Sequence, residues 1–419
     1  MENINRQENQ EIIQINKEET DKNENKKLYL FIKIIILIIY VAIIVSTEIT
    51  YRKKLFEKSI EYQEDIREKH EKKSAFYSCW KFFSAIGTHY VCLGIYFIIF
   101  IFFPLNYSFC AIQSLNLSNY ITNLLKMIYR NARPYWKSDI LDIVCNSGYG
   151  NPSGHSLVCL SFFLTISHIF TNFNFFKKTV KGKILRIVIF CFFILLAALV
   201  IISRVLVAAH SINQVIYGSL LGISIYFIPV HIFSYHTYSS EKFIEHMYNI
   251  KYFIIYIIVY ACLIILLIII YFSVSDDEDL EHLIYNKVFN GKKCDVKYKY
   301  QLLKNDGFTQ ALAITSMIGV HLGLFLLIYI LKKLKYSIEY LNEFNQSSVK
   351  RWFIRLPILI ISAIFIILYF VIPKKSSLAI IIIFKFALSF FLTSFGLYLV
   401  GIFVCIYFNF SNEKIIKSI

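Results

Sequence analysis

The sequence is poor in charged residues and in the residues that interrupt helices. Charged residues make up 17% of the 419 residues, only 6 are proline, and 57% are hydrophobic. A soluble globular domain carries more charge and has fewer uninterrupted runs of Ile, Phe and Leu. Several runs reach the roughly 20 apolar residues that cross a hydrocarbon core of about 30 Å. The composition therefore argues against a soluble protein and predicts an all-α fold, a polytopic bundle of about nine or ten transmembrane helices.

Several signatures of other function classes are also missing. The 9 cysteines show no CxxC pair or other metal-ligand spacing, and there is no glycine-rich nucleotide loop, EF-hand or repeat. We therefore expect no metal and no cofactor, while the pairing of Cys145 and Cys294, which lie in polar loops, stays open. Acidic residues are scarce, so the formal net charge is +16. The basic residues crowd short loops, which favours contact with lipid headgroups over nucleic-acid binding.

Hydropathy and charge divide the chain into four regions. Residues 1–27 are rich in Asn, Glu and Lys and are predicted to be a disordered polar tail. Residues 28–81 comprise an anchor span at 28–47, with no small-residue cleavage site after it, and then a basic surface helix. Residues 82–234 form the core, and residues 235–419 add further transmembrane helices. Beyond the anchor, spans are expected near 82–103, 106–126, 154–172, 184–203, 211–233, 251–273, 309–331, 353–372 and 379–407.

The first of three polar clusters among these apolar runs is Lys126-x6-Arg133-Pro134. Its two cations are seven residues apart, which places them on one face of a helix end, and the proline then stops the helix. Two aligned cations suit a phosphate dianion, because arginine offers a bidentate fork. The plainer interpretation is snorkelling of basic side chains at a helix end.

The second cluster, Pro152-Ser153-Gly154-His155, has the residues of a helix N-terminus. Free backbone N–H groups at such a position attract anions, and Gly154 lets a substrate oxygen approach the backbone. His155 then lies beside the oxyanion and can give a proton to a leaving alkoxide. The plainer interpretation is a capped helix start with an exposed histidine.

The third cluster is Ser203-Arg204-x5-His210, in a short turn between two spans. A histidine here is a candidate nucleophile that attacks phosphorus and forms a phosphohistidine. Arg204 is suited to neutralise charge on the equatorial oxygens of the transition state. The plainer interpretation of His210 is an interfacial histidine whose hydrogen bonds are satisfied.

The order of the spans predicts that all three clusters meet on one membrane face. Lys126 ends the third span and Ser153 begins the fourth, while the fifth span runs antiparallel to the fourth and ends at Ser203. The basic connections 177–186 and 332–355 are expected in the cytoplasm, which makes the cluster face lumenal or extracellular. The basic residues of 49–81 then fall on the cluster side, against the positive-inside rule.

These clusters resemble the signature of the type 2 phosphatidic acid phosphatase and vanadium haloperoxidase superfamily, K-x6-RP, PSGH and SR-x5-H-x3-D. The first two are complete, but Gln214 stands where most members have Asp. The glucose-6-phosphatase branch also has Gln at this position, and the Arg133-Pro134-Tyr135-Trp136 segment resembles the sequence of that branch. The resemblance covers about 80–408, with specific motifs only near 126–218. That branch has nine spans, so the 28–47 span and the tail before it are an addition here.

The resemblance implies an integral membrane phosphatase that has a six-helix phosphatase core in 82–234. It implies metal-independent hydrolysis of a phosphomonoester, in which His210 attacks, His155 protonates the leaving group and Gln214 orients the nucleophile. The implied location is the endoplasmic reticulum, with the active site facing the lumen. The phosphate-binding residues that it implies are Lys126, Arg133, Ser153, Gly154 and Arg204.

Two other functions fit the same residues. A lipid phosphatase acting on phosphatidate, sphingoid-base phosphate or a polyprenyl diphosphate needs only six spans, and Tyr149-Gly150-x-Pro152-Ser153 resembles sphingoid-phosphate phosphatases. A non-catalytic transporter or scaffold would instead hold an anion in a basic pocket between spans. The expected partners are therefore the lipid bilayer and a phosphorylated small molecule or lipid, with no nucleic acid; protein partners are unknown.

Overall fold

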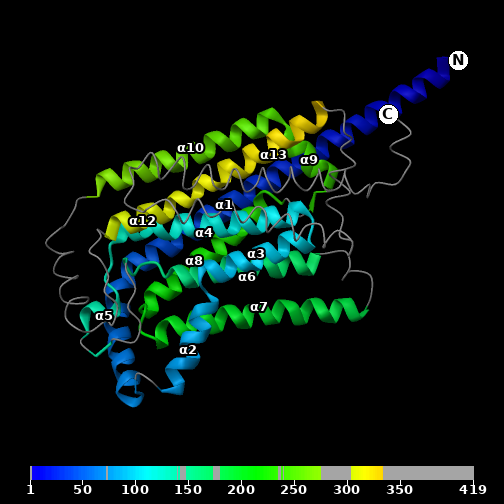
Figure 1. Ribbon diagram of the computed structural model, residues 1–419. Helices are drawn as coiled ribbons and strands as arrows, with labels where there is room; N and C mark the ends of the chain where they lie inside the picture. The colour runs from blue at the N-terminus through cyan, green and yellow to red at the C-terminus, as the bar shows by residue number, and fades with distance from the viewer. Residues whose placement is uncertain are drawn as a thin grey trace.

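The computed structural model is a bundle of long helices, shown in Figure 1. It describes residues 2–71, 74–138, 140–141, 148–172, 180–234, 237–238, 240–274 and 303–333, and these residues contain helices but no strand. The prediction of an all-α fold is therefore confirmed. The α-helices are α1 (Glu2–Lys69), α2 (Ala75–Ile86), α3 (His89–Phe102), α4 (Leu105–Tyr129), α5 (Pro134–Lys137), α6 (Gly154–Asn172), α7 (Val180–Leu206), α8 (Ile212–Phe227), α9 (Ser240–Tyr248), α10 (Ile250–Ser273), α12 (Leu303–Ala311) and α13 (Thr315–Lys333).

Among the described residues, six helices are long and apolar enough to cross a membrane, and the bent pair α2 and α3 makes a possible seventh. The six are Lys27–Lys69, Gly154–Asn172, Gly182–Leu206, Ile212–Ile232, Ile250–Ser273 and Gly307–Leu326. Large apolar side chains of α1, α7 and α10 are exposed on the outside of the bundle, where lipid would cover them. The chain is an integral membrane protein. The expected spans 353–372 and 379–407, together with Cys145 and Cys294, lie outside the described residues.

Helix α4 covers the expected span 106–126, lies inside the bundle (Figure 1) and carries amide side chains among its apolar residues. The sequence predicts that its amides find partners on other helices. Asn119 donates to the carbonyl of Gln310 at 2.8 Å, and Asn116 accepts from the hydroxyl of Ser316 at 3.3 Å. Both bonds reach the C-terminal helices, so polar residues in α4 join the two halves of the described chain.

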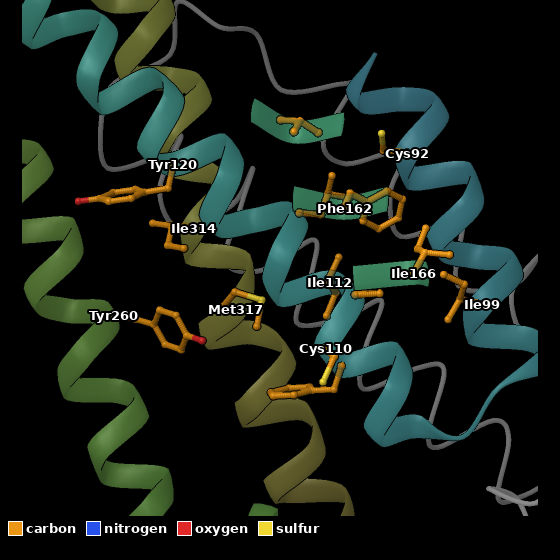
Figure 2. Packing of buried hydrophobic residues seen from close by; sticks show 14 of the residues in the cluster. Cys92, Ile99, Cys110, Ile112, Tyr120, Phe162, Ile166, Tyr260, Ile314 and Met317 are labelled. Carbon is orange, nitrogen blue, oxygen red and sulfur yellow. The ribbon is translucent and has the colours of Figure 1, made fainter. Parts of the chain in front are cut away.

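Around α4 the core is a continuous apolar cluster (Figure 2). Ile112 and Cys110 of α4 lie near Phe162 and Ile166 of α6, and on the other side near Met317 of α13 (Figure 2). All five side chains are at most 6% exposed. Buried side chains in such a core have well-defined positions, which makes the cluster a rigid support for the loops at the ends of α4 and α6.

Close contact between α6 and α8 depends on two glycines one turn apart in α8. A Cβ at Gly218 would meet the carbonyl oxygen of Ser153 at 2.6 Å, and one at Gly222 would meet that of Leu157 at 2.8 Å. Small residues at this spacing let two helix backbones approach closely. The approach brings the start of α6, with its PSGH sequence, against the start of α8.

Two expectations about the N-terminal region differ from the structure. Residues 1–27 are expected to be a disordered tail, and 28–47 and 49–81 two separate elements, but α1 is one helix from Glu2 to Lys69. The sequence has no glycine or proline before Gly87, and the charged stretches are rich in Glu, Gln and Lys, which are good helix formers. Nothing in the chain therefore stops the helix at the end of the apolar run.

Candidate functional site

The structure gathers the three polar clusters at one end of the bundle, which carries α5 in Figure 1. Lys126 lies in the last turn of α4, and Arg133 is the residue before α5. Gly154 begins α6, Arg204 lies in the last turn of α7, and His210 lies in the loop between α7 and α8. Helix ends that alternate in direction thus bring residues 126–210 to one place.

The imidazole of His210 is held by hydrogen bonds on both ring nitrogens. Nδ1 lies 2.8 Å from the carbonyl oxygen of Gly150 and 3.2 Å from Oε1 of Gln214. Both partners are acceptors, so Nδ1 carries the proton. Nη1 of Arg133, which can only donate, lies 3.2 Å from Nε2. The ring is therefore the tautomer whose Nε2 carries the lone pair, and this lone pair faces the guanidinium of Arg133.

The amide of Gln214 is oriented by two other groups. Its Nε2 donates to the carbonyl oxygen of Ala132 at 2.7 Å, and its Oε1 accepts from the backbone N–H of Ser211 at 3.3 Å. These bonds keep Oε1 pointing toward Nδ1 of His210, which fixes the ring tautomer. Gln214 therefore contacts the ring of His210 and also supplies a donor that aspartate does not have.

Burial lowers the pKa of His210 well below its ordinary value of 6.5, and the positive charges of Arg133, Arg204 and Lys126 lower this pKa further. His210 is 2% exposed. The neutral ring is therefore the form present at neutral pH, which a nucleophile requires.

Arg133 joins the first cluster to the third. Its Nε donates to the carbonyl oxygen of Gly148 at 2.7 Å, and its Nη1 donates to that of Ala209 at 3.1 Å. The side chain is 3% exposed, so these bonds fix the guanidinium beside His210. A buried cation next to His210 favours binding of an anion at this position.

Arg204 is the second buried guanidinium of the site, at 2% exposed. Its Nη1 donates to the hydroxyl of Ser84 in α2, and among the described residues its Nε and Nη2 have no hydrogen-bond partner. Buried donors of a charged group are seldom left unpaired, and an oxyanion is the ligand that best satisfies two adjacent guanidinium N–H groups. The sequence gives no signal for Ser84, because a serine within an apolar helix is common.

The PSGH segment is only partly as expected. The backbone N–H of Ser153 donates to the carbonyl oxygen of Gln214 at 3.0 Å, so this amide is engaged within the protein. The hydroxyl of Ser153 accepts from Ser156 at 2.9 Å. A Cβ at Gly154 would lie 3.8 Å from Nζ of Lys126, so the glycine leaves space beside this ammonium group.

His155 lies on the first turn of α6 and is half-buried. No described residue forms a hydrogen bond with its ring, which leaves both nitrogens available to a substrate. Its Cδ2 would be 3.3 Å from a Cβ at Gly87, in the turn between α2 and α3. This turn is therefore a wall of the site that the motifs do not reveal.

Gly150 contacts the site, although it is not among the predicted catalytic and phosphate-binding residues. Its N–H donates to the carbonyl oxygen of Asn131 at 2.8 Å, and its own carbonyl holds His210. A Cβ here would meet Nε2 of Gln214 at 2.5 Å and the carbonyl oxygen of Ala132 at 2.7 Å. Only glycine fits this contact, and the Tyr149-Gly150 pair before the proline was the available signal.

The groups that converge on His210 are cations, amides and hydroxyls. The described residues contain no group of three or more His, Cys, Asp or Glu side chains placed to hold a metal ion. The site is positively charged and largely closed, and one of its histidines is kept neutral. Such an arrangement suits a bound phosphate or another tetrahedral oxyanion.

Comparison with known proteins agrees with this geometry. Residues 107–238 match the model of the PAP2 superfamily. The glucose-6-phosphatase catalytic subunit 1 of Felis catus is 26% identical over 143 residues, and that of Bos taurus is 26% identical over 145 residues. Each match covers 30% of this chain and 40% of the relative, so the chain spans less than half the length of these curated relatives. No solved structure gives a significant match.

The matched residues, 107–238, include all the site residues predicted from the sequence, from Lys126 to Gln214. The resemblance predicted from the sequence is therefore confirmed: residues 107–238 are similar to the PAP2 superfamily, and the chain has weak similarity to glucose-6-phosphatase catalytic subunits.

Proposed function

We propose that this protein is a membrane phosphatase that hydrolyses a phosphomonoester through a phosphohistidine, without a metal ion. The proposal rests above all on the buried pair formed by Arg204 and His210. The arginine has two unpaired donors, and the histidine is neutral with its Nε2 lone pair free of a proton. A phosphoryl group between them would satisfy the donors and lie in reach of the nucleophile.

The reaction would proceed in two displacements. Nε2 of His210 attacks phosphorus, the bond to the ester oxygen breaks, and His155 gives a proton to the departing alkoxide. Neutral His155 then accepts a proton from water as the water oxygen attacks phosphorus, which frees His210 and releases phosphate.

Each cation has a separate part in this scheme. Lys126 and Arg133 would hold the equatorial phosphate oxygens from the α4–α5 side, and Arg204 from the α7 side. The hydroxyl of Ser153 and the backbone of Gly154 complete the phosphate site. In the phosphohistidine, the Nδ1–H of His210 still donates to Gly150 and Gln214, which stabilises the charged ring.

Two observations favour a sugar phosphate as the substrate. Gln214 stands at the position where the sequence departs from most superfamily members, and the curated relatives are glucose-6-phosphatase catalytic subunits. The alternative substrate class is a lipid phosphate. A detergent-solubilised sample, supplied in turn with glucose 6-phosphate and phosphatidate, separates them. Strong hydrolysis of phosphatidate with none of the sugar phosphate would reject the sugar-phosphate assignment.

The His210→Ala variant tests the mechanism. We expect it to lose turnover and to yield no acid-labile phosphoprotein, whereas the parent protein, quenched during turnover of a labelled substrate, should yield one. A variant that keeps full turnover would show that another group attacks phosphorus.

We further propose that the site faces the lumen of the endoplasmic reticulum. The basic connections 177–186 and 332–355 support a cytoplasmic location for the opposite end of the bundle. Glu61 is exposed on α1 near the site end, so a Glu61→Cys variant can be labelled with a membrane-impermeant maleimide. Labelling above the parent level should require permeabilised microsomes. Equal labelling of intact microsomes would place the site in the cytoplasm.

A further inference from the structure

Helix α1 lies outside the matched residues 107–238, yet it carries a row of polar residues toward the site. The row consists of Glu48, Arg52, Ser59 and Gln63, whose spacings of four, seven and four residues place them on one face of the helix. Glu48, Ser59 and Gln63 are buried, at 6%, 0% and 2% exposed. Burying polar side chains is costly without hydrogen bonds, so their partners are informative.

Gln63 bonds to the loop that carries the nucleophile. Its Nε2 donates to the carbonyl oxygen of Val205 at 2.9 Å and to that of His210 at 2.8 Å. One amide group thus joins the last turn of α7 to the far end of the α7–α8 loop. Ala208, between the two, has φ 54, a left-handed conformation that a non-glycine residue adopts only when its surroundings impose it.

Glu48 bonds to the two residues that precede functional positions. Its Oε1 accepts from Nδ2 of Asn151 at 2.8 Å and from Nδ2 of Asn213 at 3.1 Å. Asn151 comes directly before the PSGH sequence, and Asn213 comes directly before Gln214. A single buried carboxylate therefore sets the separation between the second and the third cluster.

The other two residues of the row complete the set. The hydroxyl of Ser59 accepts at 2.8 Å from the backbone N–H of Ile212, which lies in the first turn of α8 and has no acceptor within that helix. Nη1 of Arg52 lies 3.4 Å from Oδ1 of Asn131, just after α4. Each of the three segments that bear site residues thus receives at least one bond from α1.

We infer that this face of α1 positions the catalytic loops, and that Gln63 and Glu48 are positioning residues for the nucleophile. None of these four side chains forms a hydrogen bond with Lys126, Arg133 or Arg204, the cations assigned to phosphate. The row should therefore govern the rate of attack more than the binding of substrate. This inference rests on the proposed function only for its kinetic test, since the contacts themselves can be measured without turnover.

The kinetic test compares Gln63→Met and Glu48→Met with two controls. Methionine keeps the length and volume of each side chain but removes the hydrogen-bonding atoms. We expect kcat to fall about 10- to 100-fold, because a displacement of about 1 Å in an attacking group has this effect, while KM changes less than about threefold. Glu48→Gln keeps an acceptor oxygen and should restore most of kcat. Glu61→Met, on the exposed side of α1, should behave as the parent protein.

Hydrogen–deuterium exchange across residues 207–213, with and without inorganic phosphate, provides the readout that does not depend on turnover. Gln63→Met should accelerate exchange in this segment, and Glu61→Met should not. Parent kinetics in both methionine variants would overturn the inference, as would equal losses in Glu48→Gln and Glu48→Met. If the parent protein hydrolyses no phosphate ester, the proposed function fails, and exchange in 207–213 alone then decides whether α1 holds the loop.

Discussion

Gln214 stands where the SR-x5-H-x3-D signature has an aspartate, and the Gln214→Glu variant tests what the amide group contributes at this position. The glutamate side chain has the same shape, so its oxygens can still accept from Nδ1 of His210 and from the N–H of Ser211. It cannot donate to the carbonyl oxygen of Ala132, which lies 2.7 Å from Nε2 of the glutamine. One hydrogen bond is lost and one negative charge is placed in a buried site.

The two effects have different magnitudes and different readouts. Loss of the bond to the half-buried carbonyl oxygen of Ala132 costs about 0.5–1.5 kcal/mol and should lower the melting temperature. The carboxylate also attracts the proton on the imidazolium, and an opposite charge at this distance raises a histidine pKa by about 1–3 units. In the parent protein burial and the three cations hold the pKa of His210 well below 6.5.

The assay is the pH profile of kcat/KM, whose acid limb reports the protonation of His210 in the free enzyme. The attacking ring must be neutral, so activity is lost as pH falls through this pKa. The limb should lie well below pH 6.5 in the parent protein and move upward in Gln214→Glu. Gln214→Met, which removes all three bonds and adds no charge, should lower the melting temperature more without raising the limb. An unshifted limb in Gln214→Glu, with an unchanged melting temperature, would refute the orienting role.

Three further predictions concern single contacts. His155→Ala should reduce kcat by about 10²- to 10⁴-fold with an alkyl phosphate, and much less with p-nitrophenyl phosphate, whose leaving group needs no proton; an equal loss with both substrates would contradict the general-acid role. Arg204→Lys should raise KM about 10-fold or more in steady-state assays, because lysine lacks the planar fork; an unchanged KM would remove Arg204 from the phosphate site. Gly218→Ala should lower the melting temperature, since its Cβ would lie 2.6 Å from the carbonyl oxygen of Ser153. Gly94→Ala, at a position with open space around it, should leave the melting temperature unchanged. An equal fall in both variants would show that the contact between α8 and Ser153 does not matter for stability.

The sequence was sufficient to predict that the three clusters meet. Apolar runs of membrane-spanning length alternate in direction, so the end of one span and the start of the next must lie on the same side. The spacing of Lys126, Ser153 and Ser203 relative to those runs therefore determined their face. The hydrogen-bond partners could not be predicted in this way. The carbonyl groups that hold His210 and Arg133 belong to Gly150, Gly148 and Ala209, and a carbonyl group is present at every residue.

The engaged amide of Ser153 shows a related limit. A serine at the start of a helix predicts a free N–H that points toward a ligand. In the structure Gly218 lets α8 approach so closely that the carbonyl oxygen of Gln214 accepts this N–H instead. Which of two acceptors a helix terminus finds depends on the distance between two helices, and no local pattern encodes that distance.

The sequence does not reveal the buried polar face of α1, and the reason is again physical. Polar residues at helical spacing, next to many Lys and Glu residues, indicate a helix that lies on a surface with that face in water. A buried row of hydrogen-bonding side chains has the same spacing, because both arise from one helical period. Gln63 and Glu61 show the difference, since the first is 2% exposed and the second lies on the exposed side only two residues away. The partners of the buried row lie after α4, before α6, and between the end of α7 and the start of α8, and these segments come together only once the bundle has formed. A helix that precedes the matched residues can therefore belong to the catalytic unit, and the boundary at residue 107 does not mark where the site's support begins.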